Sequence, residues 1–124
     1  MSSIFEKTLL YDFYGELLTE HQKEIYELYN LNDLSLGEIS EQLGISRQGV
    51  HDTLKRCDKQ LDNYENKLQL VDKFLSNKQK IDNIFTCTSS ILEELALQEK
   101  IPRQMVISRI EEIQKACKNI LEEL

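Results

Sequence analysis

The amino-acid sequence predicts an all-α protein: a helix-turn-helix domain, a long connecting helix and a C-terminal helical segment. Three observations support this fold. The 124 residues include only one Pro and four Gly, so few positions interrupt a helix. Apolar residues recur at steps of three and four along most of the chain, as they do on the buried side of a helix. Three short segments also contain the capping box, a Ser or Thr followed three residues later by Glu or Gln, which is typical of helix starts.

The capping boxes place the starts of the first three helices at Ser3, Thr19 and Ser35. The first two helices carry apolar residues at helical spacing, and the second is expected to end near Asn30. The letters "NLND" that begin there are typical of a turn. The first 34 residues therefore predict a helical pair that leads into the next motif.

The segment "LSLGEISEQLGISRQGVHDTLKRC" has the spacing of two helices that cross steeply through a short turn. Gly44 can take the left-handed conformation that turns the chain, and Ser46 is placed to cap the following helix. Apolar residues on the two helices would then face one another across the turn. The predicted helix-turn-helix core consists of Ile39, Leu43, Gly44, Ile45, Val50 and Leu54.

The helix that begins at Arg47 occupies the position of a recognition helix. Arg and Gln near its start can read base edges, and the lysines farther along suit phosphates, whereas Asp52 would repel a phosphate. The candidate contacts to a nucleic acid or another partner are Ser46, Arg47, Gln48, His51, Asp52, Lys55 and Lys59. The alternative is an ordinary solvated face with ion pairs such as Asp52–Arg56.

An apolar stripe with heptad spacing continues from the recognition helix to Leu75, so a single helix is expected to reach that residue, with a break at "SNK". We therefore expect a first domain over residues 1–62 and a second over residues 63–124. Two further amphipathic segments follow, the last beginning near Pro102. The possible dimer or bundle seam consists of Leu68, Val71, Leu75, Val106, Ile110, Ile113, Cys117 and Ile120. A homodimer is expected, although a bundle within one chain fits the same pattern.

Composition and motifs argue against an enzyme. The three Cys form no C-x-x-C pair, the two His have no metal-ligand spacing, and neither a Gly-rich phosphate loop nor a nucleophile turn occurs. The sequence therefore predicts no catalytic residues, no metal and no cofactor. It also has no apolar run of about 20 residues and no secretory signal, so we expect a cytoplasmic protein without a membrane partner.

The formal net charge of −7 is concentrated near the N-terminus. Residues 1–34 contain two Lys against seven Asp and Glu, a balance of −5, which leaves −2 for the remainder. This distribution weakens long-range attraction to nucleic acid, because phosphate binding depends on Lys and Arg.

The segment "LTEHQKEIYELYNLNDLSLGEISEQLGISRQGVHDTLKRCDKQL" resembles region 4 of bacterial sigma factors. The first two-thirds of the chain, with "YDFYGELLT", "LSLGEI" and "GISRQGVHD" in order, is similar to the YlxM family of small bacterial helix-turn-helix proteins. The resemblance implies a sigma-region-4-like fold and an accessory or regulatory role in the signal recognition particle pathway, through binding of the particle's GTPase subunit, its RNA, or both. It also implies a recognition role for Arg47, Gln48, His51, Asp52 and Lys55.

Two other functions fit the sequence. One is a dimeric DNA-binding transcriptional regulator that places two copies of the recognition helix in successive major grooves. The other is a protein-interaction scaffold whose acidic first two helices dock onto a basic partner.

Overall fold

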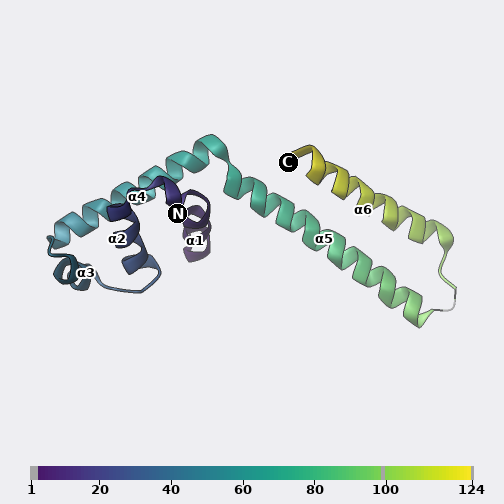
Figure 1. The fold of residues 1–124 in the computed structure, drawn as a ribbon. Helices are drawn as coiled ribbons and strands as arrows, with labels where there is room; N and C mark the ends of the chain where they lie inside the picture. Colours follow the sequence, from purple (N-terminus) through teal and green to yellow (C-terminus); the bar gives the residue numbers. More distant parts are fainter. Residues whose placement is uncertain (1–2, 99, 124) are drawn as a thin grey trace. The chain divides into compact units, whose positions relative to one another are not determined.

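The computed structural model describes residues 3–98 and 100–123, and within them it contains helices and no strand (Figure 1). The elements are α1 (Ile4–Tyr14), the short 3-10 helix η1 (Gly15–Leu17), α2 (Glu20–Asn30), α3 (Leu36–Leu43), α4 (Arg47–Leu68), α5 (Leu70–Leu97) and α6 (Arg103–Glu123). The all-α fold predicted from the sequence is confirmed. Residues 1–2 of the first predicted domain and residues 99 and 124 of the second lie outside the described residues.

The starts of the first three helices follow the local sequence signals. The Ser3 hydroxyl accepts a hydrogen bond from the Glu6 backbone N–H at 3.1 Å, and the capping boxes at Thr19 and Ser35 are complete, with side chain and backbone bonded in both directions. α2 ends at Asn30, and the predicted turn follows it. Because these caps satisfy N–H groups that have no partner within a helix, residues near in sequence determine where each helix begins.

The turn between α3 and α4 has the predicted left-handed glycine. Gly44 has φ 68°, and the Ser40 carbonyl accepts hydrogen bonds from the backbone N–H groups of Gly44 and Ile45 at 3.0 and 3.2 Å. The Ser46 hydroxyl then caps α4 by accepting from the Gly49 N–H at 3.0 Å. Of the residues predicted to form the helix-turn-helix core, Ile39, Val50 and Leu54 are buried, Leu43 and Ile45 are half-buried, and Gly44 is exposed.

The chain divides into two compact units, residues 1–71 and 72–124, and not after residue 62. In the first unit α1, α2 and α3 pack against α4. Its core contains large side chains with less than 2% of their surface exposed: Tyr14, Ile25, Tyr26, Ile39, Val50, Cys57 and Leu61. The first unit therefore has a hydrophobic core of its own.

The prediction of one helix from Arg47 to Leu75 is wrong. α4 ends at Leu68, Gln69 has φ 55°, and α5 runs through the "SNK" segment where a break was expected. The Tyr14 hydroxyl accepts from the Leu70 N–H at 3.0 Å, and the Glu65 carboxylate accepts from the Val71 N–H at 3.0 Å. These bonds satisfy N–H groups of the first turn of α5, so the chain can leave the helical path here without unsatisfied donors.

The second unit is an antiparallel hairpin of α5 and α6 (Figure 1). Lys80 pairs with Glu123 at 2.9 Å near one end, and Arg109 reaches Glu94 at 3.2 Å and Ser90 at 3.0 Å near the other. No described residue of α6 is buried. Of the predicted seam, Leu68 and Val71 lie in the first unit, exposed and buried respectively. Within the hairpin Leu75, Val106, Ile113 and Ile120 are half-buried, whereas Ile110 and Cys117 are exposed.

A membrane span requires a long and apolar helix. Over the described residues, no helix is both long enough and apolar enough to cross a bilayer.

Candidate nucleic-acid interface

The candidate interface is the side of α4 that points away from the core of the first unit. Val50, Leu54, Cys57 and Leu61 form the buried side of this helix. At 100° per residue the opposite side is formed by positions 48, 52, 55 and 59, which are Gln48, Asp52, Lys55 and Lys59. All seven predicted contact residues, from Ser46 to Lys59, are exposed.

At the start of α4, two predicted contact residues are already engaged within the protein. The Ser46 hydroxyl is used as the helix cap, as described above. The Arg47 side chain runs back over the first turn of α3, because a Cβ atom built on Gly37 would lie only 3.0 Å from Arg47 Nη2. Gly37 therefore leaves room for the guanidinium, and Arg47 would have to swing outward to reach a base.

One turn farther, three polar residues form a local cluster. The Gln48 amide donates a hydrogen bond to Asp52 Oδ1 at 2.9 Å, and His51 Nδ1 lies 3.6 Å from the same oxygen. Asp52 thus accepts a hydrogen bond from Gln48, with His51 nearby, and is not paired with Arg56 as the spacing suggested. Reading a base edge with Gln48 would require breaking its bond to Asp52, so this end of the helix is poorly prepared for direct sequence readout.

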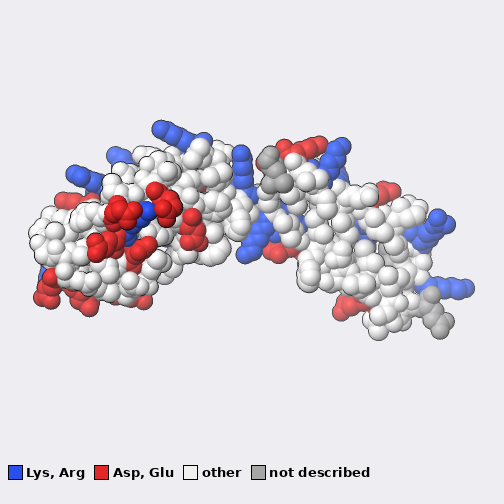
Figure 2. Space-filling view, viewed as in Figure 1, with Lys and Arg blue, Asp and Glu red and all other residues white. Residues whose placement is uncertain are grey.

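Beyond Asp52 the outward side of α4 becomes basic. Lys55, Arg56 and Lys59 are exposed, and within the described part of the chain no carboxylate oxygen lies within 4.0 Å of their charged nitrogens. Figure 2 shows Lys and Arg side chains projecting along the outer edge of α4. We call Lys55, Arg56 and Lys59 the basic row.

The side chain of a neighbouring acidic residue, Asp58, packs away from this surface. Asp58 is half-buried and pairs with Lys7 of α1 at 3.8 Å. Burial raises the pKa of Asp58, the nearby Lys7 lowers it, and the charge of Asp62 raises it again. Asp58 therefore faces α1, whereas exposed acids flank the basic row on the outward side, Asp52 before it and Asp62 after it.

The acidic residues of the first unit gather over α2 (Figure 2). Several of them have internal partners: Lys23 Nζ lies 2.9 Å from Glu16 and 3.3 Å from Glu20, and the Tyr11 hydroxyl donates to Glu27 at 2.6 Å. The hydrogen bond to Glu16, more than the one to Glu20, raises the pKa of Lys23 and keeps it charged. Acidic and basic surfaces of the first unit are therefore separated, and Lys23 compensates part of the acidic charge.

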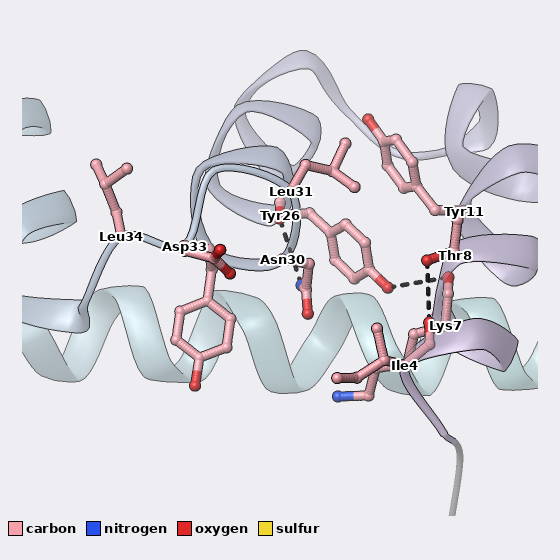
Figure 3. A pocket seen from close by; sticks show the side chains of 10 residues that line it. Ile4, Lys7, Thr8, Tyr11, Tyr26, Asn30, Leu31, Asp33 and Leu34 are labelled. Carbon is pink, nitrogen blue, oxygen red and sulfur yellow. Dashed lines mark hydrogen bonds between the residues drawn. The ribbon is translucent and has the colours of Figure 1, made fainter.

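A hollow of about 350 Å³ lies between α1 and the end of α2 (Figure 3). Tyr11 and Tyr26 stack at its wall, with ring centroids 4.8 Å apart. Its polar groups are bonded to one another: the Thr8 hydroxyl donates to the Ile4 carbonyl, the Tyr26 hydroxyl to the Lys7 carbonyl, and the Asn30 amide to the Tyr26 carbonyl. The bond from Tyr26 to Lys7 joins α2 to α1, whereas the other two bonds each lie within one helix, so we interpret the hollow as a packing gap between these two helices.

Sequence reasoning missed two features of this unit. Arg56 was not among the predicted contact residues and entered only as an example of an ion pair in the alternative of a solvated face, although its exposure follows from the position of Val50 and Leu54 on the helix. The bonds from Tyr14 and Glu65 to the start of α5 had no signal in the sequence, because Tyr14 lies on α1, far from α5 along the chain.

Residues 1–90 match the protein family UPF0122, described as "Putative helix-turn-helix protein, YlxM / p13 like". A UPF0122 protein of Thermoanaerobacter sp. (strain X514) is 48% identical over 113 residues, covering 91% of this chain and 92% of that protein. One from Caldanaerobacter subterraneus subsp. tengcongensis is 61% identical over 80 residues, 64% of this chain and 68% of the relative. The UPF0122 protein YlxM of Bacillus subtilis is 45% identical over 85 residues, 68% of this chain and 77% of the relative.

Proposed function

Because this chain belongs to the UPF0122 family of YlxM/p13-like helix-turn-helix proteins, as its motifs predicted, we propose that it is a non-enzymatic regulatory protein that binds nucleic acid through α4. We further propose that it serves the signal recognition particle pathway, the role implied by the motifs "YDFYGELLT" and "GISRQGVHD". Its target would then be the RNA of the particle, with the GTPase subunit as an additional protein contact.

The observation that carries the proposal is the contrast between the basic row and the acids of the same unit. Lys55, Arg56 and Lys59 have no carboxylate within 4.0 Å among the described residues, whereas Glu16, Glu20 and Asp58 are paired with lysines. An unpaired basic row gains most from phosphates, because each contact releases counterions from the nucleic acid. A basic protein partner would gain no binding energy from the basic row, because like charges repel one another.

The local cluster at the start of α4 favours recognition of backbone and shape over recognition of base edges. Gln48 is bonded to Asp52, and Arg47 lies over Gly37. RNA helices are recognised mainly through phosphates, 2′-hydroxyls and shape, whereas a promoter reader needs direct contacts to base edges. For this reason we place RNA ahead of operator DNA as the target.

The test is a fluorescence-anisotropy titration of labelled signal recognition particle RNA with the full chain at several salt concentrations. The double variant Lys55→Ala/Lys59→Ala should weaken binding at least tenfold at low salt. It should also reduce the slope of log affinity against log salt by roughly 1.5, because each lost phosphate contact contributes about 0.7 to 0.9. The matched control is Lys115→Ala/Lys118→Ala, which removes the same charge from exposed positions of α6.

The other outcomes would contradict the proposal or favour one of the two alternative functions. Equal losses from both double variants would show that only net charge matters, and the assignment to α4 would fail. Binding to a selected palindromic duplex that depends on Arg47 would favour the DNA regulator. Association with the GTPase subunit that is abolished by reversing Glu20, Glu24 and Glu27 to Lys, but not by changes in the basic row, would favour the protein-interaction scaffold.

A further inference from the structure

The α5–α6 hairpin has almost no core of its own. None of the described residues of α6 is buried, and in α5 only Val71 is buried, a residue that belongs to the first unit. Surface ion pairs such as Lys80–Glu123 contribute little to stability, because water screens both charges. Two isolated helices bury too little apolar surface to stabilise each other in water, so the hairpin requires more apolar contact than α5 and α6 provide.

α5 carries a line of exposed apolar side chains beside the surface that packs on α6. Ile81, Phe85 and Leu92 are 54%, 72% and 68% exposed, and their spacing of four and seven residues places them on one line along the helix. Leu95, 54% exposed, continues the line toward the end of α5. The half-buried residue before Phe85, Ile84, points about 100° away, toward α6, where it lines a small hollow with Ile113.

α6 carries a matching line. Ile110 is 46% exposed and Leu121 is 69% exposed, with Cys117 exposed between them. The half-buried Val106 and Ile113 lie between α5 and α6. Their side of α6 comes before the exposed line in the direction in which the helix turns. On both helices the exposed line is therefore displaced in the same rotational sense from the residues that lie between α5 and α6.

In an antiparallel pair, equal displacements in the same sense bring the two lines to the same side of the hairpin. They form one continuous surface, which we call the open face and define as Ile81, Phe85, Leu92, Leu95, Ile110 and Leu121. The heptad positions of α5 from Ile81 to Leu95 are Ile, Phe, Thr, Leu and Leu, without a charged residue. Figure 2 likewise shows a side of the hairpin that is largely free of charged side chains across its middle.

We propose that the open face is covered by the open face of a second copy of this chain, so that two hairpins form a four-helix bundle. The occupant must supply a permanent core, since the hairpin lacks one without it. A second copy brings an apolar face of the same length in equal amount, and a two-fold axis makes one patch self-complementary. An uncharged apolar centre is also typical of permanent interfaces, whereas transient ones are more polar. This inference does not depend on what α4 binds.

The experiment is sedimentation equilibrium of the full chain over a range of micromolar concentrations. The wild type should approach twice the monomer mass of 14.6 kDa. Phe85→Glu should weaken the dimer at least a hundredfold, because each copy would bury an unpaired carboxylate. Leu92→Ala, which stays apolar, should weaken it by roughly tenfold or more.

The matched control is Leu97→Glu. Leu97 is 84% exposed but lies about 120° around α5 from Phe85, outside the open face. This variant makes the same chemical change and should leave the dimer constant within about threefold. The five Tyr all lie within residues 1–71, so near-ultraviolet circular dichroism shows whether the first unit stays folded in each variant.

The proposal is overturned by a wild-type chain that stays monomeric while its hairpin remains helical. It is equally overturned by a dimer that Phe85→Glu and Leu97→Glu weaken alike, or that neither Phe85→Glu nor Leu92→Ala weakens. Loss of dimer with Phe85→Glu and Leu92→Ala, with an unchanged tyrosine signal and an intact dimer in Leu97→Glu, supports it.

Discussion

The two units of this chain are both built from helices, yet they differ in how those helices are stabilised. The first unit surrounds α4 with three other helices and buries Ile25, Ile39 and Val50 completely. The hairpin of α5 and α6 leaves Phe85, Leu92 and Leu121 more than two-thirds exposed. Helical periodicity alone therefore does not distinguish a domain that has a buried core from a hairpin whose apolar residues are exposed; the number of helices that share the apolar surface does.

The difference also predicts a separate role for each unit. A unit with its own core can hold α4 in one orientation and present the basic row to a nucleic acid. A hairpin with an uncovered apolar face can join two chains. We therefore expect a substitution in one unit to leave the properties of the other unit unchanged.

The largest difference should appear in the reactivity of the cysteines. Cys57 is buried in the first unit, and burial raises the pKa of its thiol to about 11, whereas Cys117 of the hairpin is exposed. At pH 8 and low protein concentration, Cys117 should be alkylated roughly a thousandfold faster, because Cys57 reacts only when the unit opens. Mass spectrometry of alkylated peptides measures both rates. Similar rates would contradict a closed core, and Cys117 should slow down as the chain dimerises.

Removing a core side chain from the first unit should cause the largest loss of stability. Leu61 is 1% exposed, and Leu61→Ala should lower the free energy of unfolding by about 2 to 5 kcal/mol. Urea unfolding followed by the tyrosine circular dichroism signal measures it. Leu92→Ala in the hairpin is the counterpart and should leave this signal's midpoint within experimental error. A shift of similar size would mean that the two units unfold together.

The junction between α4 and α5 should show an intermediate effect. The Tyr14 hydroxyl donates to Glu65 at 2.6 Å and accepts from the Leu70 N–H, so Tyr14→Phe removes both bonds and leaves a backbone donor without its partner. We expect a loss of about 2 kcal/mol in the unfolding of the first unit. Tyr29→Phe, on a ring that is 42% exposed, is the control and should cost a few tenths at most. Equal effects would show that the junction bonds are unimportant.

The helix-turn-helix turn should show the smallest of these effects. A Cβ on Gly44 would meet nothing within 4 Å, so the cost of Gly44→Ala comes from its φ of 68° alone. We expect a loss of about 1 kcal/mol, and less for Gly44→Asn, because Asn tolerates the left-handed region. Urea midpoints of the two variants provide the comparison, and an Asn variant less stable than the Ala variant would refute this explanation.

The sequence predicted the parts of this molecule that depend on near neighbours. The capping boxes, Gly44 and the spacing of Ile39, Val50 and Leu54 located the helices of the first unit and its turn. It failed at Gln69, where the heptad pattern continues but the helix does not, because the stabilising bonds come from Tyr14 on another helix. Outward positions of α4 were also predictable, whereas the internal partners of Asp52 and Asp58 depend on rotamers and on packing against α1.

Amide hydrogen exchange of the full chain at two concentrations tests the contrast between the units most directly. One concentration lies well below the dimer dissociation constant and the other well above it. We predict that amides in the middle of α5 and α6 become at least tenfold more protected at the higher concentration, whereas those in the middle of α2 and α4 do not change. Protection in α5 and α6 that is strong and independent of concentration would show that the hairpin stabilises itself, and would contradict the account.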